Sequence, residues 1–138
     1  MNGADFLDTN VVVYAYDDSN PQKQRVARHL LKGGVSGNIV ISTQVLAEFA
    51  ATMLHKVSPP ATADAVMEGL DALTAIRLIV PDEELVRRAV EARAAYGLHF
   101  YDGMIVAAAE RAGCARILSE DLNAGQNYFG VVVTNPFL

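Results

Sequence analysis

The sequence predicts a single α/β domain, built as a three-layer α/β/α sandwich around a central parallel sheet of about five strands. Short apolar segments alternate with longer segments of helical periodicity along residues 1–138. Strands separated by helices imply right-handed crossovers and hence a parallel sheet. The length suits one domain, and a hydrophobic fraction of 51% is enough to form a core.

Hydrophobic periodicity and end signals place the elements in order. The expected strands are 5–7, 38–41, 77–80, 116–119 and 130–134, and the expected helices are 21–32, 43–56, 60–74, 82–96 and 101–112. Asn20 is a good N-cap, and Pro21 suits the first helical position. Glycines 33, 97 and 113 follow three of the helices, where a left-handed residue commonly ends a helix.

Composition and charge limit the classes of protein that fit. The net charge of −5 argues against nucleic-acid binding, which usually requires a basic surface. Carboxylates clustered around divalent cations would account for much of this negative charge and would be neutralised locally. The single cysteine, Cys114, excludes an intrachain disulfide and favours a reducing compartment. Asp5 and Asp8 interrupt the apolar N-terminal residues, so we expect no signal peptide. The longest apolar runs fall far short of the ~20 residues that span a bilayer, and we expect a cytoplasmic protein without membrane contact.

Four acids occupy positions where chemistry is expected. Asp8 and Asp121 follow predicted strands, Glu48 lies on the polar side of helix 43–56, and Asp102 opens an almost wholly apolar helix. Each has an ordinary alternative as a cap, a turn residue, a helix-dipole partner or a solvated side chain. Ligands of parallel sheets bind beyond the carboxyl ends of the strands, where all four acids could meet.

Clustered carboxylates favour a hard divalent cation, because like charges at close range otherwise raise each other's pKa. Mg²⁺ or Mn²⁺ with oxygen ligands resolves the repulsion. Such a centre supports phosphodiester hydrolysis by activating water and stabilising charge on the phosphate. The pattern therefore indicates a metal-dependent phosphodiester hydrolase.

At these acids the sequence resembles the PIN-domain ribonucleases, in particular the VapC toxins of bacterial toxin–antitoxin pairs. The matching strings are FLDTN (6–10), STQVLAE (42–48), FYDGMIVAAA (100–109) and ILSEDL (117–122), and together they span most of the chain. The resemblance implies a PIN-like sandwich and an endoribonuclease that binds Mg²⁺ or Mn²⁺ through Asp8, Glu48, Asp102 and Asp121. It further implies that Thr9 and Ser119 hydrogen-bond the ligands or water.

The same resemblance implies partners. Family members cut single-stranded or looped RNA, such as transfer RNA, and form homodimers. The tail of a VapB antitoxin covers the active-site groove. Residues 57–60 correspond to part of a helical hairpin around which dimer and antitoxin contacts gather. One departure is Gly103, where alanine is usual, and we expect it to loosen the start of that helix.

Two other function classes fit part of the pattern. A phosphoryl-transfer domain would explain Asp8 after the first strand. The phosphatase type, however, requires a second acid at the position of Asn10, and the receiver type requires a lysine near a late strand, whereas no lysine follows Lys56. A non-catalytic PIN module that binds RNA or a partner protein is the second alternative. Two groups of basic residues could contact RNA phosphates or only solvate a helix: Arg25, Arg28 and Lys32, and Arg87, Arg88 and Arg93.

Overall fold

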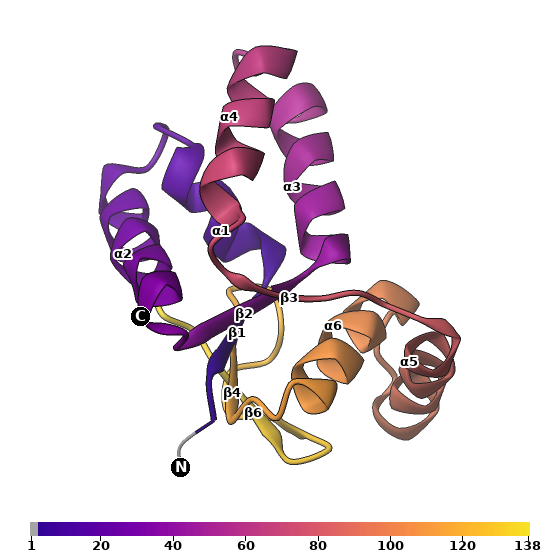
Figure 1. Cartoon of the computed structure of the whole chain (residues 1–138). Helices are drawn as coiled ribbons and strands as arrows, with labels where there is room; N and C mark the ends of the chain where they lie inside the picture. The colour runs from indigo at the N-terminus through magenta and orange to yellow at the C-terminus, as the bar shows by residue number, and fades with distance from the viewer. Residues whose placement is uncertain (1–2) are drawn as a thin grey trace.

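A six-stranded sheet with helices on both faces forms the centre of the structure, a computed structural model that describes residues 3–138. The strand order is β3-β2-β1-β4-β6-β5, and every neighbouring pair is parallel except β5 with β6. Helices α1 to α4 lie on one side of the sheet, and α5 and α6 lie on the other (Figure 1). The predicted three-layer parallel sandwich is therefore confirmed.

The strands are β1 (Asp5–Leu7), β2 (Ile39–Ser42), β3 (Arg77–Ile79), β4 (Arg116–Leu118), β5 (Asn127–Tyr128) and β6 (Val131–Thr134). The helices are α1 (Thr9–Tyr16), α2 (Pro21–Lys32), α3 (Thr43–His55), α4 (Ala63–Leu73), α5 (Glu83–Tyr96) and α6 (Phe100–Arg111). A 3₁₀ turn, η1 (Gly33–Ser36), follows α2.

Two elements differ from the sequence prediction. The sheet has six strands instead of about five, because the two-residue β5 forms a hairpin with β6 that is too short to show a pattern. Helix α1 was not predicted, because its VVVYA stretch is apolar throughout and rich in β-branched residues, which favour strands. Burial on several sides and the cap from Asp8 stabilise the helix instead.

The sheet topology creates a switch point beside β1. After β1 the chain moves outward through β2 to β3, and it then crosses to the other side of β1 to form β4. Ligand sites of open α/β sheets lie at the carboxyl ends of strands where the order reverses in this way. Asp8 directly follows β1, and Ser119 directly follows β4, so both lie at this point.

The core surrounds the central strands. Phe6, Leu7, Val40, Ile41 and Ile117 of β1, β2 and β4 are fully buried. Strands buried on both faces consist of continuous apolar residues, as expected for a parallel sheet between helix layers. The core therefore fixes the strands whose ends carry the acids.

Gly103 has a packing role that the sequence did not reveal. A Cβ at this position would lie 2.7 Å from the main-chain oxygen of Ala89, which belongs to α5. The glycine therefore lets α6 approach the backbone of α5 more closely than alanine would. The expected loosening of the helix start is replaced by tight packing of the two helices.

None of the helices within residues 3–138 is both long and apolar enough to cross a membrane.

Candidate active site

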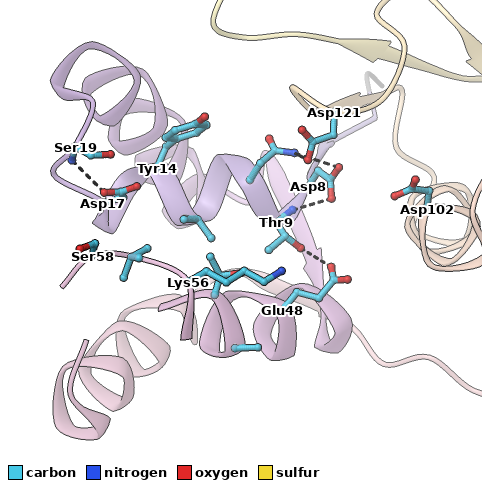
Figure 2. A pocket seen from close by; sticks show the side chains of 15 residues that line it. Asp8, Thr9, Tyr14, Asp17, Ser19, Glu48, Lys56, Ser58, Asp102 and Asp121 are labelled. Atoms are coloured by element: carbon cyan, nitrogen blue, oxygen red, sulfur yellow. Dashed lines mark hydrogen bonds between the residues drawn. The ribbon is translucent and has the colours of Figure 1, made fainter. Parts of the chain in front are cut away.

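The four predicted acids line one pocket of about 710 Å³. Asp8, Glu48, Asp102 and Asp121 reach it from the end of β1, from α3, from the first turn of α6 and from the segment after β4 (Figure 2). The structure thus brings together side chains that are up to 113 positions apart in the chain, from 8 to 121.

Asp8 is the most buried of the four, with 6% of its surface exposed. As the N-cap of α1, its Oδ1 accepts a hydrogen bond from Thr9 N at 2.8 Å. Its Oδ2 accepts one from Ser119 Oγ, also at 2.8 Å. The cap that was the ordinary alternative for Asp8 is therefore real, and it orients a carboxylate that also faces the pocket.

Ser119 joins the two acids that follow strands. Its fully buried hydroxyl donates to Asp8 and accepts from the main-chain nitrogens of Asp121 and Leu122, at 3.1 and 3.2 Å. The loop after β4 therefore closes around one hydroxyl that also touches Asp8.

Asn10 was not predicted as a site residue, yet its amide lies between the same groups. Its Nδ2 donates to Asp121 Oδ2 at 3.1 Å and lies 3.5 Å from Asp8 Oδ2. Its Oδ1 accepts from Glu120 N at 3.1 Å. A second link joins the loop to the helices, since Glu120 forms an ion pair with Lys23.

Thr9 and Gln44 orient Glu48. Thr9 Oγ1 donates to Glu48 Oε1 at 2.7 Å, so the residue after Asp8 connects the first acid to the second. Gln44, one helical turn before Glu48, donates to its Oε2 at 3.4 Å and to Tyr101 O at 3.0 Å. Because Tyr101 precedes Asp102, this amide also holds the start of α6 against α3.

The site is electrostatically unfavourable without a cation. Burial, opposed by the hydrogen bonds from Ser119 and Thr9 and increased by the nearby charges of Asp102 and Asp121, raises the pKa of Asp8 from 3.8 to about 6. Burial also raises the pKa of Asp102, partly offset by His99, and Glu48 and Asp121 add to the increase. Neighbouring carboxylates thus disfavour the charged form of both Asp8 and Asp102.

The donor set suits a hard divalent cation, since all four groups are carboxylates and two have raised pKa values. Among residues 3–138, however, no three acidic, histidine or cysteine side chains are close enough to hold one ion as they stand. The carboxylates surround a shared space instead of meeting at a point. Ion binding would therefore require some side chains to turn inward or water to complete the coordination.

The PIN domain family profile matches residues 6–129, which include all four acids. The chain belongs to the PIN domain family. A search of curated protein sequences finds no significant match.

Solved structures agree with this PIN fold. A toxin–antitoxin complex from Klebsiella pneumoniae matches with a TM-score of 0.69 and 21% identity, covering 96% of this chain and 98% of that chain. VapC20 from Mycobacterium tuberculosis, described as a toxin that cleaves the sarcin–ricin loop, matches with a TM-score of 0.69 and 15% identity, covering 86% and 90%. FitAcB from Neisseria gonorrhoeae matches with a TM-score of 0.67 and 20% identity, covering 96% and 98%.

The structure of this PIN domain also separates the basic residues. Several of the candidates for RNA contact are engaged elsewhere: Arg87 pairs with Glu83, Arg88 pairs with Glu110, and Arg28 and Arg93 donate to main-chain oxygens. Lys56, which the sequence analysis did not select, lines the pocket with the acids. No sequence signal distinguished it, because a lysine near the end of a helix is usually a solvated one.

Proposed function

We propose that this PIN domain is a Mg²⁺- or Mn²⁺-dependent endoribonuclease toxin of the VapC type, which hydrolyses RNA phosphodiester bonds and is neutralised by a cognate antitoxin. The observation that carries the proposal is the pocket that Asp8, Glu48, Asp102 and Asp121 line together. These acids come from four different segments of a chain that belongs to the PIN family. We expect the protein to act in the cytoplasm.

The chain's own residues would hold and orient the ligands. Asp8 is fixed by Thr9 N and by Ser119, and Asp121 by the amide of Asn10. Glu48 is oriented by Thr9 and Gln44 from opposite sides. A divalent cation, when bound, supplies an activated water at neutral pH and stabilises charge on the phosphate.

An apolar cavity beside the pocket supports the antitoxin as a partner. The cavity is lined by aromatic and aliphatic side chains that include Tyr16, Phe49, Met53 and Val66, together with the 57–60 segment between α3 and α4. It shares Asp17, Ser19, Val57 and Ser58 with the acidic pocket, so a chain bound in one cavity reaches the other. An apolar groove next to a polar site suits an amphipathic segment of a second protein.

A homodimer would bury apolar side chains that this chain leaves exposed. Leu78 and Val80 near β3 and Val86 and Val90 of α5 are all exposed. Large exposed apolar side chains favour a protein interface where they form one patch. Light scattering after size exclusion should give twice the 14.8 kDa mass of the chain, and the monomer mass would exclude the dimer.

The activity is tested on the purified protein, freed of any antitoxin. Total RNA and transfer RNA are incubated with Mg²⁺, Mn²⁺ or EDTA, and fragments are resolved on denaturing gels. Asp8→Asn is compared with Asp17→Asn, which removes an acid from the same pocket outside the predicted set. We expect discrete fragments that need the metal, vanish in Asp8→Asn and persist in Asp17→Asn.

The alternative is a PIN module that binds RNA or a protein without cutting. The spacing of the acids favours this alternative, because within the described residues no three of them lie close enough together to hold one metal ion. Titration of Mn²⁺ by calorimetry separates the two. Absence of Mn²⁺ binding, together with undiminished growth arrest by Asp8→Asn in cells, would favour the non-catalytic module.

A further inference from the structure

We propose that Lys56 forms a binding site for an RNA phosphate next to the one being cut, which deepens and rests on the function proposed above. The pocket continues past the four acids between α1 and α3, toward Asp17, Ser19 and Ser58. Lys56 is the basic residue among those lining it. A polyanionic strand that follows this pocket therefore meets one positive charge.

The position of Lys56 on α3 directs its ammonium group toward the acids. Lys56 is the C-cap of α3 and lies eight residues after Glu48, which corresponds to about 12 Å along the helix axis. Side chains on a helix tilt toward its N-terminus, which here is the end nearer the acids. Figure 2 shows the Lys56 side chain extended along the pocket in that direction.

The charge of Lys56 is not neutralised within the described part of the chain. No carboxylate oxygen of residues 3–138 lies within 4.0 Å of the Lys56 Nζ, the distance limit for an ion pair, although five acids line the same pocket. Lys23, the other lysine near the site, is paired with Glu120. Lys56 is therefore available to an anion from outside the chain.

A phosphate is the anion that fits this arrangement. Lysine is a flexible point charge that binds phosphate without a fixed geometry. The acids need a cation before they tolerate a phosphate nearby, whereas Lys56 attracts one without it. The ammonium thus offsets part of the repulsion that a chain of net charge −5 exerts on RNA.

The test measures RNA binding without cleavage. Both charge variants are built in an Asp102→Asn background, and fluorescence anisotropy gives the Kd of a labelled single-stranded uridine decamer in fixed Mg²⁺ at several KCl concentrations. Lys56→Gln is compared with Arg77→Gln, which removes the same charge at the start of β3, at the edge of the parallel sheet away from the acids and outside the pocket. Arg77, like Lys56, forms no side-chain ion pair in the described residues.

Loss of one phosphate contact should lower the slope of log K against log salt by about 0.7 and weaken binding about fivefold near 0.1 M salt. We expect both changes in Lys56→Gln and neither in Arg77→Gln, and restoration in Lys56→Arg. An unchanged slope in Lys56→Gln, or equal changes in the two variants, would overturn the inference.

The proposed function is judged separately on the protein with Asp102 intact. If that protein cleaves RNA while Lys56→Gln keeps the parent salt slope, the phosphate site is wrong and the nuclease stands. If it cleaves nothing while the slope falls in Lys56→Gln, the nuclease is wrong and the phosphate site stands. In an active enzyme, Lys56→Gln should raise KM more than it lowers kcat.

Discussion

The two ends of α6 carry acids in opposite situations. Glu110, in the last turn, accepts two hydrogen bonds of 2.8 Å from Arg88, which holds the pKa of its carboxyl below the usual range. Asp102, in the first turn, forms no ion pair among residues 3–138, and its pKa is raised by burial and by the charges of Glu48 and Asp121.

The difference shows what each end of the helix is for. Arg88 also lies 3.6 Å from the centre of the Phe129 ring, so the paired end fastens α6 to α5 and to the β5–β6 hairpin. The unpaired end holds its charge where the protein supplies no partner. The fold neutralises Glu110 at one end of α6 but supplies no partner for Asp102 at the other. The unpaired charge of Asp102 lowers the stability of the protein unless a ligand binds.

The largest expected effect is on RNA cleavage, from a substitution at the unpaired end of α6. Asp102→Asn removes a proposed metal ligand with little change of shape, and RNA cleavage should fall by more than about 100-fold, beyond what an outer-shell partner is worth. Glu110→Gln, an equal change on the same helix, should leave the cleavage rate within about twofold of the parent. Single-turnover assays compare the two, and equal losses would remove the distinction between the ends.

The raised pKa of Asp8 predicts a pH-dependent stability in EDTA. A carboxyl whose pKa moves from 3.8 to about 6 binds its proton more tightly in the folded protein. Its contribution is therefore fully present below about pH 4 and is lost as pH rises through 6, on the order of 3 kcal/mol. Urea unfolding between pH 4.5 and 7.5 measures the change.

Two controls sharpen this expectation. Asp8→Asn should flatten the pH dependence, because the titrating group is gone. Saturating Mn²⁺ should raise stability most at neutral pH, where the carboxylate is charged. A stability that rises with pH in EDTA, and does so equally in Asp8→Asn, would contradict the assigned burial of Asp8.

Asn10 should be a positioning residue for the two acids that follow strands. Asn10→Ala removes the amide between Asp8 and Asp121, and Mn²⁺ affinity should fall about 10- to 100-fold, as for other partners of metal ligands. Tyr14→Phe provides the matched variant, because it removes a 2.7 Å hydrogen bond from the same helix to Glu120. That variant should lose stability while Mn²⁺ affinity, measured by calorimetry, stays unchanged.

The smallest expected effect is on stability, from a substitution at the paired end of α6. Glu110→Gln weakens a partly exposed ion pair, and the free energy of unfolding should fall by about 1 kcal/mol. High salt should reduce the difference between the variant and the parent, since screening weakens the pair. A loss that does not depend on salt would show that packing of Arg88 on Phe129 matters more than its charge.

The sequence predicted the parts of the molecule that local patterns encode. Helix α2 carried its own start signals in Asn20 and Pro21, and the structure shows Asn20 capping it. Helix α1 was missed because apolar residues cover it all round, so its helical state depends on tertiary packing. Asp8 and Asp121 were predictable because they follow strands, and topology brings strand ends together. Glu48 and Asp102 were predictable because they lie near the starts of helices that begin at the same edge of the sheet.

The hydrogen-bonding shell of the site was predicted less completely. Thr9 and Ser119 were selected, and the structure places both against the acids. Asn10 and Gln44 were not, because an amide signals its role only through the groups it meets in space. Gly103 was misinterpreted for the same reason, since the carbonyl it accommodates lies 14 positions earlier, at residue 89.

The pairing of β1 with β4 has a consequence for synthesis of the chain. Residues 5–7 are synthesised well before one of their sheet partners, residues 116–118. The groups around Asp8 therefore assemble only after β4 has been made. A nascent chain that lacks Ser119 and Asp121 cannot build the pocket, so any chemistry of this pocket begins only after the segment beyond β4 has left the ribosome.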